Sequence, residues 1–199
     1  MNTKKSVMLI VMVGLFATAS LFKAHNASAQ EDRWSGRTIT GTTYFVSGPR
    51  PGRTLPFSLI INRLTTANEV GELNSALQSG QDELLHTLSK MNAGRIEVGT
   101  GVGLTANAIL ATDEGDGRTK ITVLYQRYVR FAELRSGARS EDYRFGYAEL
   151  HLGRGSHEGM FIPAARIRLR GGNTWEVEDF GTFPARLMGL RVHGRGPVG

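Results

Sequence analysis

Two glutamates and two histidines in the C-terminal half have the types and spacing that could do chemistry. Glu149 and His151 stand two residues apart in a run of strand-like composition, so their side chains would share one face of that strand. His157 and Glu158 follow after a glycine-rich turn and could approach from there. Imidazole nitrogens and carboxylate oxygens bind metal ions such as Zn²⁺ and also exchange protons in acid–base catalysis. These four are therefore weak candidates for a metal or acid–base site; solvated surface histidines are the competing interpretation.

The remaining motifs favour structural interpretations. The glycines of 99–103 lack both the dinucleotide spacing and the Gly-Lys-Ser/Thr ending of phosphate loops, so they predict a hairpin or bulge. The acidic run 113–117 does not match a calcium-binding loop and predicts a hairpin turn. Ser156 has no Gly-x-Ser-x-Gly context, and His86 lies among helix-forming residues at an exposed position. No coherent catalytic set emerges, so the sequence favours a non-catalytic protein without a cofactor.

The elements that must position these residues lie in the C-terminal third. Runs 143–153, 160–170, 174–180 and 183–191 mix apolar and charged residues, and Gly, Pro or Asn bounds each of them. This is typical of an antiparallel meander. Aromatic residues in these runs are expected in the core, although they leave open a lined cavity.

Alternation of side chains predicts the register of the central hairpin. If residues 171–173 form a three-residue loop, apolar side chains face one another, and arginines meet glutamates on the other face. That pairing favours a solvated, charge-paired face over an arginine stripe for acidic polymers. The expected pairs are Leu169 with Trp175, Ile167 with Val177, Arg168 with Glu176, and Arg166 with Glu178.

The fold class predicted from the whole chain is α+β and β-dominated. We expect an antiparallel meander sheet, curled or barrel-like, with a two-helix hairpin at about 66–92 inserted after the second strand. Thr66 and Glu69 have capping-box spacing at the first helix, and the second is predicted over 81–91. The element order resembles up-and-down barrels that carry lipophilic ligands, but no ligand-carrier motif supports that likeness. Further strands are expected at 38–46, 55–64, 95–98, 104–112 and 118–131, the last with a bulge or bend near Gln126.

The first 29 residues have the layout of a secretory signal peptide. Lys4 and Lys5 precede an apolar run over 7–22, and Ala27-Ser28-Ala29 supplies a cleavage site. We expect cleavage near Ala29, which would give a periplasmic or extracellular protein. The alternative is that the segment stays uncleaved and anchors the protein, and this is the only membrane contact that we expect. The predicted organisation is a signal peptide over 1–29, one β-rich domain over 30–192, and a disordered tail over 193–199.

The composition of the chain limits the classes of partner that we expect it to bind. The formal net charge of +6 falls to +3 once the three lysines of residues 1–29 are removed. No basic cluster interleaved with aromatic residues is present, so nucleic acid is not an expected partner. The chain has no cysteine, which excludes disulfides, thiol catalysis and cysteine metal sites. Its core alone must hold the domain together.

The segment from Arg166 to Phe180, with Phe183 to Arg191, resembles small exported bacterial proteins of uncharacterised function. The resemblance implies export and a β-rich fold, and supplies no site residues. Three functional hypotheses follow. The first is an exported non-catalytic domain that binds a small apolar ligand or an envelope partner. The second is a metal-assisted or acid–base hydrolytic enzyme that uses the His/Glu residues, and the third is a structural or interaction module of the cell envelope.

Overall fold

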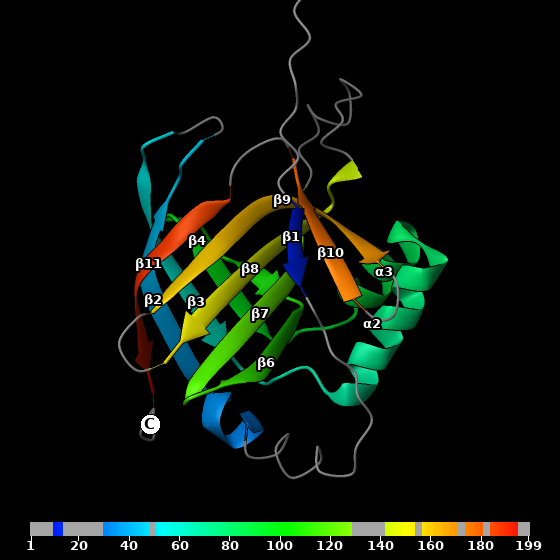
Figure 1. Cartoon of the computed structure of the whole chain (residues 1–199), viewed down its shortest axis with the longest axis horizontal. Helices are drawn as coiled ribbons and strands as arrows, with labels where there is room; N and C mark the ends of the chain where they lie inside the picture. The colour runs from blue at the N-terminus through cyan, green and yellow to red at the C-terminus, as the bar shows by residue number, and fades with distance from the viewer. Residues whose placement is uncertain are drawn as a thin grey trace, which may run out of the picture.

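The protein is β-dominated α+β, with one antiparallel sheet of eleven strands and a pair of helices beside it (Figure 1). The computed structural model describes residues 10–13, 30–47, 51–128, 142–153, 157–170, 174–180 and 184–194. The main path of the sheet runs β5-β4-β3-β2-β11-β9-β8-β7-β6, and β10 and β1 branch from β9. The strands are β1 Ile10–Val13, β2 Arg37–Tyr44, β3 Thr54–Ile61, β4 Gly94–Val98, β5 Leu104–Ala106, β6 Ala108–Gly115, β7 Arg118–Gln126, β8 Phe145–Leu152, β9 Glu158–Arg170, β10 Thr174–Asp179 and β11 Ala185–His193.

The helical hairpin forms where it was predicted, between β3 and β4. α2 spans Ala67–Ser79, and α3 spans Gln81–Ser89. Thr66 caps α2 in a complete capping box, in which the Thr66 hydroxyl accepts from the Glu69 N–H and the Glu69 carboxylate accepts from the Thr66 N–H. Gly80 separates the helices with φ of 129°, a conformation that side-chain-bearing residues rarely adopt. The capping box therefore predicted the start of the hairpin correctly.

The β9–β10 register is confirmed in full. All six pairs from Thr174–Arg170 to Asp179–Ala165 are present, including Trp175 with Leu169 and Val177 with Ile167. Trp175, Val177 and Ile167 are buried, as the alternation required. One detail differs: the ion pair on the charged face is diagonal, from Arg168 to Glu178 at 2.9 Å.

The fourth run of the expected meander takes a different place. β11 does not pair with β10; it pairs with β9 over Gly159–Phe161 and with β2 on its other side. The cause lies in the length of β9. Its register against β8 shifts between the pairs of Phe145 and Tyr147, which is a β-bulge. The half before the bulge accepts β11, and the half after it pairs with β10.

The curled or barrel-like closure expected from the sequence is not found: the sheet is neither closed nor strongly curled. Within the described part of the chain no ladder joins the end strands β5 and β6. The single strand expected over 104–112 is broken at Asn107, which lies between these two strands. The Asn107 side chain donates to the Met91 carbonyl at 3.0 Å and accepts from the Gln126 N–H at 2.8 Å. It thus satisfies backbone groups at a point where the chain changes direction.

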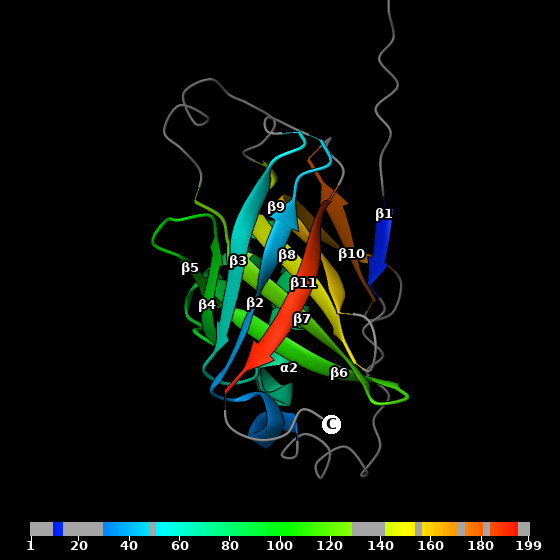
Figure 2. The same ribbon diagram turned by 90° about the vertical axis from the view of Figure 1, so that its left-hand side faces the viewer.

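Two buried clusters hold the two faces of the sheet. The first collects apolar residues from β2 to β9 and β11, among them Ile39, Leu59 and Ile121. Twist along the sheet brings β2, β3 and β11 across β6 to β8, so residues from distant strands share this cluster (Figure 2). The second cluster lies between α2, α3 and the outer face of β6 to β10. Among the residues whose side chains the structure describes, neither cluster has a member before Trp34.

Both ends of the chain add to the sheet. Within the predicted signal peptide, Ile10–Val13 forms β1, whose ladder partner among the described residues is β10. The rest of the predicted signal peptide, residues 1–9 and 14–29, lies outside the described residues, as do the last three residues of the strand predicted over 118–131. At the other end β11 includes His193, whose ring bonds to the Thr40 hydroxyl at 2.8 Å. Strand structure thus extends one residue into the predicted tail, whose last five residues are not described.

Candidate functional site

Glu149 and His151 lie side by side on the outer face of β8. His151 Nε2 is 2.9 Å from a Glu149 carboxylate oxygen. The other ring nitrogen, Nδ1, is 2.9 Å from Glu114 at the far end of β6. One imidazole is therefore held between two carboxylates that come from strands on either side of β7.

His157 and Glu158 do not join this pair. His157 Nδ1 lies 2.9 Å from the Leu190 carbonyl, so the ring is directed toward β11 rather than toward β6. Glu158 is exposed, although its backbone is paired with that of His151. Among the described residues, no group of three or more His, Asp or Glu side chains is arranged to hold a metal ion.

Two partners of this cluster were assigned other roles from the sequence. Glu114 was placed in a solvated hairpin turn, and Tyr147 among the core aromatics. The Tyr147 hydroxyl donates to Glu149 at 2.6 Å, so four side chains form one chain of hydrogen bonds from Tyr147 through Glu149 and His151 to Glu114. The i, i+2, i+4 spacing of Tyr147, Glu149 and His151 on one strand was available as a signal. Glu114 was not predictable, because two strand pairings separate it from His151.

The electrostatics of the cluster favour a protonated imidazole. Partial burial lowers the pKa of His151, but the hydrogen bonds and charges of Glu114 and Glu149 outweigh it, and the pKa is raised. Burial, together with the negative Glu149, raises the pKa of Tyr147 well above its ordinary value. When protonated, His151 donates to a carboxylate from each nitrogen. It then has no nitrogen left to accept a proton from a substrate, so the arrangement acts as a charged clamp between β6 and β8.

The other candidate motifs have structural roles. The glycines of 99–103 connect β4 and β5, which pair as a hairpin. The acidic run 113–117 is the β6–β7 turn, where Asp113 accepts from the Gly115 N–H at 2.8 Å. His86 is exposed on α3, and Ser156 lies outside the described residues.

A groove of about 620 Å³ lies toward the opposite end of β7 from His151, where α3 meets β5 and the end of β7. It combines exposed apolar surface with positive charge. Tyr128 is 76% exposed and Leu104 41% exposed, and the two lie together in this groove. None of the described residues that line it is an Asp or a Glu. Its apolar and cationic lining residues are Leu85, Met91, Leu104, Tyr128, Lys90, Arg127 and Arg144.

The walls of this cationic groove are fixed by hydrogen bonds. Arg127 Nε donates to the Tyr143 carbonyl at 2.9 Å, and the Arg127 N–H donates to the Arg144 carbonyl at 2.8 Å. Arg144 is also ion-paired with Asp82 of α3. Within the groove, the Asn107 side chain donates to the Met91 carbonyl. Three cationic side chains thus lie at the border of the groove, and one of them, Arg144, is ion-paired with Asp82.

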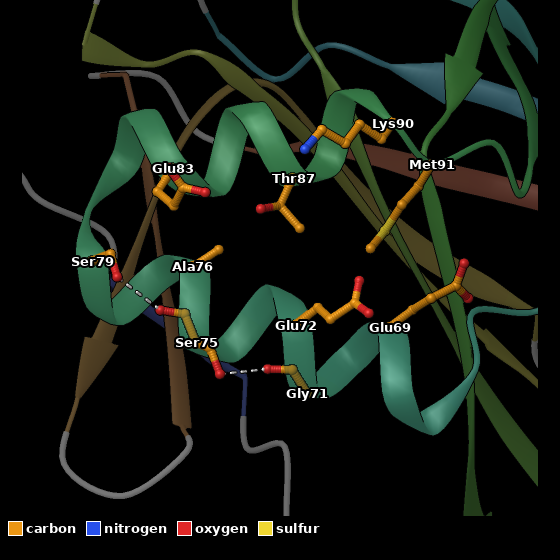
Figure 3. Close-up of a pocket in the computed structure, with 10 residues that line it drawn as sticks. All are labelled: Glu69, Gly71, Glu72, Ser75, Ala76, Ser79, Glu83, Thr87, Lys90 and Met91. Atoms are coloured by element: carbon orange, nitrogen blue, oxygen red, sulfur yellow. Dashed lines mark hydrogen bonds between the residues drawn. The ribbon is translucent and has the colours of Figure 1, made fainter.

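A second groove, of about 770 Å³, runs between α2 and α3 and is polar (Figure 3). Its serines are already bonded within α2, Ser75 to the Gly71 carbonyl at 3.0 Å and Ser79 to the Ser75 carbonyl at 3.3 Å. Glu69 on its wall is occupied by Arg63 at 2.7 Å. Because its serine hydroxyls are already bonded and three glutamates line it, Glu69, Glu72 and Glu83, this groove is the weaker candidate for an anionic ligand.

Comparison of the chain with protein-family models, with curated proteins and with solved structures found no match. The similarity to small exported proteins stays a hypothesis. Within the described residues, neither α2 nor α3 has the length and apolar character needed to cross a bilayer.

Proposed function

We propose that the protein is an exported, non-catalytic binding domain, cleaved near Ala29, and that the cationic groove holds a small apolar molecule with one anionic group. The observation that carries the proposal is the lining of the groove, in which exposed Tyr128 and Leu104 lie beside Lys90, Arg127 and Arg144, with no carboxylate among the described lining residues. Apolar walls bind the body of such a ligand, and a few placed charges orient it.

The catalytic alternative at Glu149 and His151 has less support. Both imidazole nitrogens are engaged by carboxylates, so the ring offers no acceptor at the pH where it is charged. His157, which would complete a second base or a metal set, faces the Leu190 carbonyl instead. The envelope-partner alternative depends on a different part of the sheet, described in the next subsection.

A pair of amphiphiles of equal chain length tests the groove. Dodecanoate should bind to the chain that begins at Gln30, whereas dodecyltrimethylammonium should bind more weakly because its charge is reversed. Titration followed by NMR should place the largest shifts at Tyr128 and Leu104. Equal binding of the two amphiphiles, or shifts confined to other surfaces, would contradict the proposal.

The two lysines that follow residue 29 supply a matched pair of variants. Lys90 lines the groove, and Lys120 lies on β7 outside it. Lys90→Gln should weaken dodecanoate binding by about two- to fivefold, which corresponds to about 0.5–1 kcal/mol for one partly exposed charge. Lys120→Gln should leave binding unchanged. Native mass spectrometry of protein taken from the periplasm or medium would show whether a natural ligand of this class co-purifies.

A further inference from the structure

The outward edge of β10 is covered by a segment that the proposed processing removes. β10 pairs with β9 on one side and with β1 on the other, where Ile10 to Val13 oppose Glu178 to Trp175. β1 lies in the apolar run of the predicted signal peptide. Cleavage near Ala29 would therefore leave the backbone donors and acceptors along this edge without their strand partner.

The chain that starts at Gln30 keeps what holds β10 in place. All members of the two buried clusters whose side chains the structure describes lie at or after Trp34, so the chain from Gln30 retains all of them. Trp175 and Val177 are at most 2% exposed in the cluster beneath the helices. Trp175 Nε1 also donates to Asn74 of α2 at 2.6 Å. The edge thus remains ordered by contacts behind it and beside it.

Of the features that usually protect an edge strand, β10 has charged side chains but neither proline nor a bulge against β9. Its sequence, Thr-Trp-Glu-Val-Glu-Asp, contains no Pro, Gly or Lys, and its ladder with β9 is regular over six pairs. It carries three carboxylates. Antiparallel pairing of two copies about Val177 would place Glu176 of each copy opposite Glu178 of the other, and like charges directly opposite are destabilising. A second copy is therefore a poor partner.

Charge and register define a better partner. Val11 and Val13 of β1 oppose Val177 and Trp175, the two residues whose side chains enter the apolar cluster. Ile10 and Met12 oppose Glu178 and Glu176. Glu178 is bonded by Tyr143 at 2.7 Å and by Arg168, whereas Glu176 has no ion pair with any described residue. Apolar residues at the two valine positions and basic residues between them fit this edge.

We propose that, after removal of residues 1–29, the free edge of β10 is the docking site for an extended segment of a partner protein. The segment carries alternating apolar and basic residues and adds antiparallel to β10, as β1 does in the full chain. Main-chain hydrogen bonds supply the affinity of such strand addition, and alternate side chains supply its specificity. The inference shares with the proposed function only the cleavage near Ala29. It does not involve the cationic groove, so either can fail alone.

The experiment compares the chain from Gln30 with the full chain. A labelled peptide centred on Lys-Val-Lys-Val is the probe, and Glu-Val-Glu-Val is its charge-reversed control. The processed chain should bind the lysine peptide at least about tenfold more tightly than the full chain does, because β1 occupies the edge in the latter. Hydrogen exchange should show new protection in β10. Equal binding by the two chains, or no binding by the processed chain, would overturn the proposal.

Two further comparisons separate strand addition from general attraction. In an antiparallel pair, every second residue of the peptide directs its N–H and C=O toward β10, and the residues between them direct theirs away. N-methylation of the residues that face β10 should therefore abolish binding. N-methylation of the other residues should leave binding intact. Glu176→Lys should weaken binding of the lysine peptide. Glu97→Lys, at a half-buried position on β4, should leave that binding unchanged. Equal effects of the two methylated peptides, or of the two variants, would refute docking at β10. So would a dimer of the processed chain that pairs through β10.

Discussion

The hydrogen bond between Asn74 and Trp175 should contribute measurably to stability, because both partners are buried. The indole N–H donates to the Asn74 oxygen at 2.6 Å, and the residues are 8% and 2% exposed. Asn74→Ala leaves a buried donor without a partner, which costs about 1–3 kcal/mol. Alanine favours a helix more than asparagine does by up to about 0.7 kcal/mol. We expect a net loss of about 0.5–2.5 kcal/mol.

Urea unfolding of a double-mutant cycle measures this bond. In a Trp175→Phe background there is no indole N–H that Asn74→Ala could leave without a partner. Asn74→Ala should therefore cost about 1–2 kcal/mol less than in the parent protein. For a chain of this size each kcal/mol corresponds to about 2–4 °C in Tm. Asn68→Ala is the matched control, since Asn68 is exposed on the same helix and should change stability by less than about 0.5 kcal/mol.

The result that would refute this reasoning is equal destabilisation by Asn74→Ala in both backgrounds. Additive effects would mean that the two side chains stabilise the protein independently, and that the hydrogen bond contributes nothing of its own. The reasoning would also be refuted if Asn74→Ala lowered the free energy of unfolding by no more than Asn68→Ala does. Protection of the Trp175 indole proton from exchange, lost in Asn74→Ala, gives a second readout of the same bond.

Three other variants test separate parts of the structure. Gly146→Ala should destabilise by about 1–3 kcal/mol or more in urea unfolding, because the new Cβ would lie 1.9 Å from the Tyr125 ring; Gly71→Ala, with open space around it, should instead stabilise α2 by about 0.5–1 kcal/mol. His151→Gln should remove a contribution that is full below pH 6.5 and declines as pH rises through the raised pKa of His151; a stability difference that grows with pH would contradict the clamp. Hydrogen bonding to Arg63 is the main cause that lowers the pKa of Glu69 to about 2, so thermal melts should show the cost of Glu69→Gln above pH 4.5 and its disappearance as pH falls toward 2. A cost of Glu69→Gln that persists at the acid end would contradict that assignment.

Local patterns predicted local structure well in this chain. The β9–β10 register followed from alternation and a short loop, because a one-residue slip would have turned Ile167 and Val177 toward solvent. The capping box at Thr66 and the start of the second helix at residue 81 likewise depend on a few residues, and both are found where expected. Such features depend on neighbours within one turn or one hairpin, which a single sequence displays directly.

Long-range placement was predictable only in part. The position of β11 depends on a bulge that divides β9 between two partners, and nothing in residues 185–193 alone specifies that choice. The partner of Trp175 is an asparagine 101 residues earlier, and the second carboxylate on His151 comes from a turn 37 residues away. Polar contacts of this kind carry no periodic pattern. The strand face predicted that Glu149 and His151 lie together, as they do, but no pattern in the sequence indicated Glu114 as their third partner.

The helical hairpin connects the two surfaces to which function is assigned. α2 supplies Asn74, which orders β10 from behind, and α3 supplies Leu85 and Lys90 to the cationic groove. Gln81, at the start of α3, donates to the Ile167 carbonyl of β9, so the junction between the helices is tied to the strand beside β10. Because both helices bury their leucines in one cluster with Trp175, displacement of the hairpin would disturb the groove and the edge together. If the hairpin couples the two surfaces, peptide binding at β10 should alter the affinity of the groove for dodecanoate, although the peptide and dodecanoate contact no residue in common.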